Sequence, residues 1–353
     1  MEQLIGYIKH FVIPFFLVVS LSFTVILILK RILYQYTLPY KHMIIRKSEI
    51  FLTEITLSKP DKNTLKYKIA KFKSEIPIHK TWCKDMLIAD LIRMESNLKG
   101  TAAKNILIIY KRLGLNKYSA SLIRDFRIFK KYHGIHHFQE LRYKPGISLI
   151  KKHLFSSNKV VRSNANIAYL LLSKGDWQAV EKLPIEASII TTIKVMDVLH
   201  SENLPIPPNI DKWLHSDNKV VIKLALMSMT FYNYRNKSAE IINLLHHDDI
   251  SLKNDVVIAI KNLFLNEAED EILSLYPTET IKIQLQMLET LAVIGSEKTI
   301  QFLKNEIIKQ QITDLKLKMV FCYNNLDPKG VDVLGTQDPD TQKMINHFRK
   351  VEL

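Results

Sequence analysis

Nineteen consecutive residues near the start of the chain, Phe11 to Leu29, carry no charged side chain. Lys9-His10 precede this run and Lys30-Arg31 follow it. Because a helix rises about 1.5 Å per residue, roughly 20 apolar residues cross the hydrocarbon core of a bilayer, which is about 30 Å thick. The run therefore predicts a transmembrane helix within residues 1–35.

A cleavable signal peptide is the alternative explanation for this run. Its apolar stretch would have about 7 to 15 residues and would end at small residues that mark a cleavage site. Here the run is longer and continues into Lys30-Arg31-Ile32-Leu33 without an A-x-A pattern. We therefore expect the segment to be retained as a single-pass anchor.

The flanking cations predict the orientation of the anchor, because positively charged loops stay on the cytoplasmic side. Lys9 is the only lysine or arginine before the run, whereas five follow it closely: Lys30, Arg31, Lys41, Arg46 and Lys47. We expect an inner-membrane protein with its N-terminus outside and its C-terminal domain in the cytoplasm. The two cysteines, Cys83 and Cys322, agree with a reducing compartment, although they could still pair.

The positive charge of the chain is concentrated next to the anchor. Lysine and arginine outnumber aspartate and glutamate 25 to 9 in residues 36–156, but are outnumbered 22 to 25 in residues 157–353. Such asymmetry suggests that one part of a chain faces a polyanion. Three readings stay open: an anionic membrane surface or acidic membrane partner, nucleic acid, and a solvated coat. The candidate contacts with an anionic surface are Lys30, Arg31, Lys41, Arg46, Lys47, Arg124, Arg127, Lys130, Lys131, Arg142 and Lys144.

Every strongly periodic segment after residue 35 is typical of a helix. In the basic segment, apolar spacing predicts helices at 82–98, 102–113 and 118–132, each followed by a glycine: Gly100, Gly114 and Gly134. Glycine tolerates the left-handed conformation that closes the last turn of a helix. We expect a compact helical segment over residues 36–156.

The second half of the chain repeats. Taking Val161, Ile189, Val221, Leu252, Ile281 and Leu315 as equivalent gives steps of 28, 32, 31, 29 and 34 residues. Each unit begins with a polar turn whose Ser, Asp or Asn can cap the following helix, as in Ser156-Ser157-Asn158, Ser216-Asp217-Asn218 and His247-Asp248-Asp249. Small residues such as Ala165 and Ala225 would let helices approach closely. A period near 30 in a helical chain indicates stacked helical pairs.

The segments Lys159-Val160-Val161-Arg162-Ser163-Asn164-Ala165 and Ser173-Lys174-Gly175-Asp176 resemble the repeats of the HEAT family. The resemblance covers roughly residues 155–335, and other copies have Ile222, Lys253, Lys282 or Lys316 in place of the arginine. The whole chain is also similar to membrane-anchored HEAT-repeat proteins of Bacteroidetes, through Leu113-Gly114-Leu115-Asn116-Lys117-Tyr118-Ser119 and Gly134-Ile135-His136-His137-Phe138. Members of that group are often encoded beside membrane glycosyltransferases, which implies a possible role beside such an enzyme.

Residue patterns that would indicate a reaction are weak. His133 and His137 have the i, i+4 spacing of metal ligands, but Gly134 between them is expected to break the helix they would need, and no third ligand stands out. The acidic run Glu267, Glu269, Asp270 and Glu271 begins a predicted helix, where a structural role is expected. We expect no cofactor, no metal and no catalytic residue.

Together these patterns predict an all-α protein. It should consist of a transmembrane helix (1–35), a basic helical membrane-proximal segment (36–156) and a HEAT-like α-solenoid of about six helical pairs (157–353). The expected function is a non-catalytic scaffold that binds a protein partner at the inner membrane. The alternative is an accessory subunit of a membrane glycosyltransferase or polysaccharide synthase. Nucleic acid is the less favoured partner, because the repeat region has a net charge of −3.

Overall fold

The computed structural model describes residues 11–58, 61–97 and 101–351. Within these ranges all regular structure is helical, as the sequence predicts, and no strand occurs. The chain divides into two compact units, Met1–Tyr143 and Lys144–Leu353. Residues 144–156 therefore group with the second unit.

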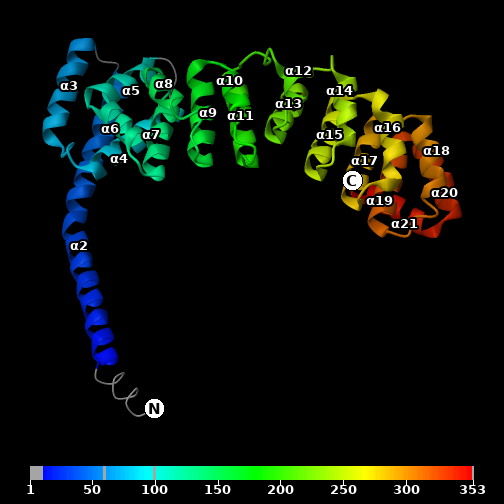
Figure 1. The fold of residues 1–353 in the computed structure, drawn as a ribbon, viewed down its shortest axis with the longest axis horizontal. Helices are drawn as coiled ribbons and strands as arrows, with labels where there is room; N and C mark the ends of the chain where they lie inside the picture. The colour runs from blue at the N-terminus through cyan, green and yellow to red at the C-terminus, as the bar shows by residue number, and fades with distance from the viewer. Residues whose placement is uncertain (1–10, 59–60, 98–100, 352–353) are drawn as a thin grey trace. The chain divides into compact units, whose positions relative to one another are not determined.

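The described part of unit 1 contains one very long α-helix and five shorter ones. The long helix α2 continues without interruption from the apolar run into the body of the unit (Figure 1). The helices of unit 1 are α2 (Ile13–Ser58), α3 (Lys62–Glu75), α4 (Thr81–Asn97), α5 (Thr101–Arg112), α6 (Leu115–Arg124) and α7 (Ile128–Glu140).

The last part of α2 holds unit 1 together. Ile44, Leu52 and Ile55 are almost fully buried, and the ring of Phe51 stacks on Phe72 of α3 with centroids 3.9 Å apart. One helical face of α2 contains residues 44, 51, 52 and 55, and this face packs against the rest of unit 1. The beginning of α2 has no such contact and stays exposed.

The sequence prediction is wrong for the third helix of the basic segment. We expected one helix over 118–132, but α6 ends at Arg124 and α7 begins at Ile128. Asp125 causes the break, because its Oδ1 accepts hydrogen bonds from the backbone N–H and the Nε of Arg127, each at 3.0 Å. Such local side-chain bonds compete with the helical ladder.

Gly134 also behaves differently from our expectation, because α7 runs through it without a break. A Cβ at this position would lie 2.6 Å from the carbonyl oxygen of Ser119 and 2.9 Å from the backbone nitrogen of Ile123, both on α6. The glycine therefore lets the backbones of α6 and α7 approach closely. Gly114, by contrast, has φ of 75° and follows α5 as predicted.

Unit 2 consists of six pairs of helices. The first helices begin at residues 159, 189, 219, 250, 281 and 313, in steps of 30 to 32 residues. They are α9 (Lys159–Ser173), α11 (Ile189–Ser201), α13 (Lys219–Phe231), α15 (Ile250–Leu263), α17 (Ile281–Ile294) and α19 (Thr313–Leu326). The second helices are α10 (Gln178–Glu181), α12 (Ile210–Trp213), α14 (Ser238–Asn243), α16 (Glu269–Leu275), α18 (Glu297–Glu306) and α20 (Pro328–Gln337). Short helices η2 (Lys144–Gly146) and α8 (Ile147–Lys151) precede this series, and α21 (Pro339–Val351) follows it.

Each first helix packs on the next one along the chain, from α9 to α19. We call this series the first-helix layer; Figure 1 shows α12 and α14 on one side of α13 and α15. Predicted caps are confirmed, since Asn158, Asn218 and Asp249 each accept a hydrogen bond from a backbone N–H of the helix that follows. Ala165 and Ala225 are fully buried at the helix contacts, as their size predicts.

Candidate functional site: the membrane helix, the basic segment and the repeat surface

The first half of α2 has the properties of a membrane-spanning helix. It has a mean hydropathy of 2.3 over its most apolar stretch, and none of that stretch is buried by the rest of the protein. Large side chains such as Phe15, Leu21 and Leu27 are more than 60% exposed. A helix of this length and apolarity, with side chains that no other part of the protein covers, is long enough to cross a bilayer.

Along α2 the five predicted cations lie at very different distances from the apolar run. Lys30 and Arg31 follow Leu29 directly, whereas Lys41 lies about 18 Å further along the helix and Arg46 and Lys47 about 26 Å, at about 1.5 Å per residue. Attraction to anionic lipid fades within a Debye length of about 8 to 10 Å. Only Lys30 and Arg31 are therefore close to the end of the apolar run.

The more distant cations of α2 contact unit 1 itself. The Nζ of Lys41 lies 5.6 Å from the ring centroid of Trp82, at the start of α4. The Nζ of Lys47 lies 3.6 Å from a carboxylate oxygen of Glu75, at the end of α3. These contacts connect this part of α2 to α3 and α4.

Four of the predicted cations come together where α6 meets α7, namely Arg124, Arg127, Lys130 and Lys131. Asp125 neutralises part of this charge, because its Oδ2 lies 3.0 Å from Arg127 and 3.1 Å from Lys130. The hydrogen bonds from Arg127, with a smaller contribution from Lys130, hold the pKa of Asp125 well below its usual range. Arg142 and Lys144 lie beyond the other end of α7 and do not join this group.

Exposed aromatic rings accompany these cations. Phe126 is 85% exposed and Phe129 is 57% exposed, and the guanidinium of Arg127 lies 5.3 and 5.8 Å from their ring centroids. A mixed aromatic and cationic turn of this kind is a surface on which another molecule can dock.

Sequence reasoning missed a second basic feature of unit 1. Lys66 of α3 and Lys111 and Arg112 of α5 line a groove of about 570 Å³ with Leu65, Ile69 and Ile108. Among the described residues, no carboxylate lies within ion-pair distance of these three cations. Their separation of 45 residues in sequence hides the cluster, because only the packing of α3 near α5 brings them together.

The histidines of α7 line a cavity of about 590 Å³ between α4, α6 and α7. His137 is 8% exposed, and its Nδ1 lies 3.0 Å from the Oγ of Ser119, which accepts a hydrogen bond from the hydroxyl of Tyr110. The Ser119 hydroxyl has one proton and two acceptor lone pairs, so the tautomer of His137 decides whether it donates to Nδ1 or accepts from it. Burial, with smaller contributions from the neighbouring His136 and His133, lowers the pKa of His137 to about 3.

His137 is thus a buried, neutral imidazole at the wall of this cavity. The ring centroids of His133 and His137 are 6.3 Å apart on one helical face. In the described ranges, no three His, Cys, Asp or Glu side chains gather in a way that could hold a metal ion.

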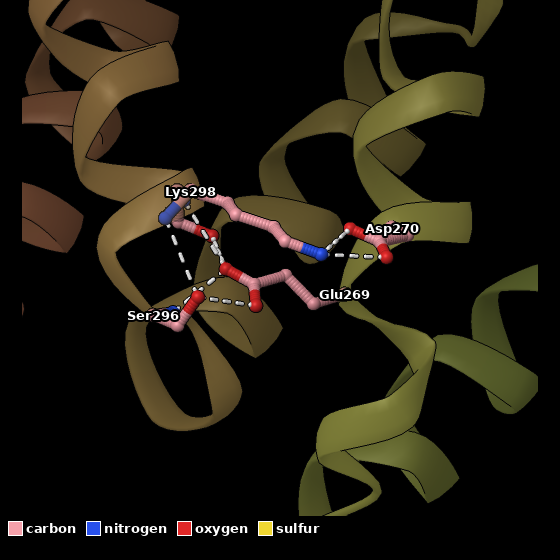
Figure 2. A network of polar contacts seen from close by, with 5 residues as sticks. Glu269, Asp270, Ser296 and Lys298 are labelled. Atoms are coloured by element: carbon pink, nitrogen blue, oxygen red, sulfur yellow. Dashed lines mark hydrogen bonds and ion pairs between the residues drawn. The ribbon is translucent and has the colours of Figure 1, made fainter.

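The acidic run at the start of α16 has a structural role. Glu269 is 7% exposed, and its carboxylate accepts a hydrogen bond from the backbone N–H of Ser296 at 2.7 Å (Figure 2). It also accepts one from the backbone N–H of Thr299 at 3.1 Å. The side-chain hydroxyls of both residues donate to the same carboxylate, at 2.7 and 2.6 Å. Burial raises the pKa of Glu269, but these bonds outweigh it and bring the pKa below its ordinary value.

Ion pairs connect neighbouring repeats across the first-helix layer. Lys223 of α13 pairs with Asp255 of α15 at 2.9 Å, and Glu289 of α17 pairs with both Lys261 of α15 and Lys318 of α19. A lysine near the start of one first helix also pairs with an acid just before the next first helix in three places: Lys159–Glu186, Lys219–Asp249 and Lys253–Glu279. In a similar way, Lys316 of α19 pairs with Asp338, which directly precedes α21. Much of the repeat region's charge is thus used internally.

The first-helix layer also carries an apolar groove of about 360 Å³ across α11, α13 and α15. Met227 and Phe231, 38% and 47% exposed, lie in this groove with Met196 and Ile258. Methionine side chains adapt to partners of different shape, and exposed apolar surface of this kind is typical of protein contacts.

No protein-family model matches this chain, and no curated protein matches it either. The structure therefore defines the protein by its architecture: an all-α chain with an N-terminal helix long and apolar enough to span a membrane.

Proposed function

We propose that this chain is a membrane-anchored scaffold whose HEAT-like α-solenoid binds a protein partner at the cytoplasmic face of the inner membrane. The observation that carries the proposal is the first-helix layer, a continuous stack from α9 to α19 with an apolar groove on it. Stacked helical pairs present extended surfaces that suit protein partners and need no particular reactive residue.

The charge of the repeats favours a protein over nucleic acid as the partner. Lys219, Lys223, Lys253 and Lys261 are engaged by acidic side chains of neighbouring repeats. Phosphate contacts require lysine or arginine side chains that can exchange counterions for phosphate. An apolar groove flanked by internally paired charges is better suited to a protein surface.

The test is a capture experiment on the full chain in detergent, with mass spectrometry of bound proteins from its own cells. Met227→Glu places a charge in the groove, while Val333→Glu changes a residue on α20 that is 61% exposed. We expect one recurrent protein to be lost with Met227→Glu and retained with Val333→Glu. Retention with both variants would reject the groove as the docking surface.

The identity of the captured protein separates the two versions of this function. Recurrent capture of an integral membrane synthase or glycosyltransferase would favour an accessory subunit, and recurrent capture of a soluble protein would favour a general scaffold. Flotation of the full chain with vesicles, resistant to high salt and alkaline carbonate, tests the anchor separately. Release under those conditions would reject membrane insertion.

A further inference from the structure

A row of large, exposed side chains runs along α2 from the apolar run into the part beyond it. We call residues 30–43 the stalk and this row the α2 seam. Its six members lie three and four residues apart in alternation and are 44–81% exposed: Ile26, Leu29, Leu33, Tyr36, Tyr40 and Met43. This alternation of three and four is the a/d spacing of a coiled coil.

The charges of the stalk avoid the seam. In the heptad that this row defines, Lys30 and Arg31 occupy positions e and f and Lys41 occupies position b, none of which faces a partner helix at its core. The next a position is Lys47, whose Nζ lies 3.6 Å from Glu75. The apolar row therefore ends where α2 enters the body of unit 1.

The rest of the chain within unit 1 does not cover this row. The face of α2 that packs into the unit consists of Ile44, Phe51, Leu52 and Ile55, and it begins beyond the last seam residue. Within the stalk, Tyr36 is 81% exposed and Leu33 is 64% exposed, although leucine outside a bilayer gains free energy by burial.

We propose that the α2 seam pairs with the same seam of a second copy of this chain, as a parallel two-stranded coiled coil. A seam of a and d residues is self-complementary, because residue a meets a and residue d meets d across a twofold axis. Two copies with the same membrane topology present their α2 helices in parallel and at the same depth in the bilayer. Residues with the same number therefore face each other without a shift of one helix along the other. The proposal depends on α2 lying in a membrane and not on what the repeats bind.

The exposed area is sufficient for such a pair. With about 150 to 250 Å² for a large side chain, the six seam residues expose on the order of 600 Å² per copy. Two copies would bury about 1,200 Å², which is at the lower end of specific protein interfaces. Shared anchoring adds to the stability, because it raises the effective concentration of one helix for the other.

Cysteine crosslinking tests the seam directly in the full chain reconstituted in vesicles. The native Cys83 and Cys322 are fully buried, and burial raises their thiol pKa to about 11 and about 12, so both thiols stay protonated. Under mild oxidation we expect Tyr36→Cys, Tyr40→Cys and Met43→Cys to form disulfide-linked dimers. Gln35→Cys and His42→Cys, which lie at c positions of the same turns, should remain monomeric.

A pattern without this periodicity would overturn the proposal, whether all five variants crosslink equally, none does, or each crosslinks to another protein. A second measurement is the mass of the detergent-solubilised protein. We expect a twofold fall in mass for Leu33→Lys, which places like charges opposite each other in the seam, and no change for Gln35→Lys. Equal masses for both variants would also overturn the proposal.

Discussion

The carboxylate of Glu269 accepts hydrogen bonds from both the backbone N–H and the hydroxyl of Thr299, in the first turn of the second helix of the following repeat. A buried acid of one repeat thus caps a helix of its neighbour, where the partial positive charge of the helix dipole also favours it. The contact couples successive repeats, so that α16 and α18 should unfold together.

Removing this cap should destabilise the repeats. Glu269→Ala leaves the N–H groups of Ser296 and Thr299 without their acceptor in a buried place, at a cost of about 2 to 4 kcal/mol in the free energy of unfolding. Asp270→Ala is the matched control, because its pair with Lys298 is exposed, with side-chain exposures of 71% and 63%. Chemical denaturation followed by circular dichroism measures both, and equal midpoints would argue against the cap.

Gly134 should resist substitution because of its position against α6. In Gly134→Ala the new Cβ would meet backbone atoms of Ser119 and Ile123 that cannot yield, so the two helices must separate. We expect a loss of about 1 to 3 kcal/mol in the free energy of unfolding, the usual range for overpacking. In the control Gly114→Asn, nothing lies within 4 Å of the Cβ position and asparagine tolerates the φ of 75°. Similar melting temperatures for the two variants would contradict this account.

Acid should destabilise unit 1 through His137. Its pKa falls from 6.5 to about 3 on folding, so between these values the unfolded chain binds a proton that the folded chain does not. Stability is therefore full above about pH 6.5 and falls as the pH decreases, by on the order of a few kcal/mol near pH 4. His137→Gln should flatten this part of the stability curve, whereas His133→Gln, at an exposed position, removes only a smaller contribution to the shift and should change the curve much less. Parallel curves for wild type and His137→Gln would contradict the prediction.

The repeat architecture could be predicted because it depends on local patterns. Polar turns at Asn158, Asn218 and Asp249 precede three of the six first helices, and their side chains cap these helices in the structure. The predicted spacing near 30 residues is confirmed by helix starts 30 to 32 residues apart. Short-range capping and helical periodicity are both visible in a linear sequence.

What the sequence did not reveal depends on contacts between distant residues. Glycine is common at helix ends, and the sequence therefore predicts one at Gly134. In the structure Gly134 instead allows α7 to pack closely against Ser119 of α6. Among the described residues, Lys66, Lys111 and Arg112 have no carboxylate within ion-pair distance, whereas Arg127 and Lys130 of the predicted set share Asp125. Ion pairs that form in the folded chain thus determine which lysine and arginine side chains remain available to a partner. A count of charges in the sequence does not show these ion pairs.

Two neighbouring positions on α13 separate the stability of the repeats from their binding. Ala225 is fully buried against adjacent helices, while Met227 is 38% exposed in the apolar groove. Ala225→Glu would bury a carboxylate without a partner, at a cost of several kcal/mol, and should abolish the cooperative melting of the repeats. Met227→Glu directs its charge to solvent and should melt close to wild type while losing the captured protein.

Thermal melting and limited proteolysis of the full chain in detergent measure the effect of Ala225→Glu on stability. If Ala225→Glu melts as wild type does, the packing of α13 described above is wrong; if Met227→Glu unfolds the chain, its loss of binding carries no information about the groove.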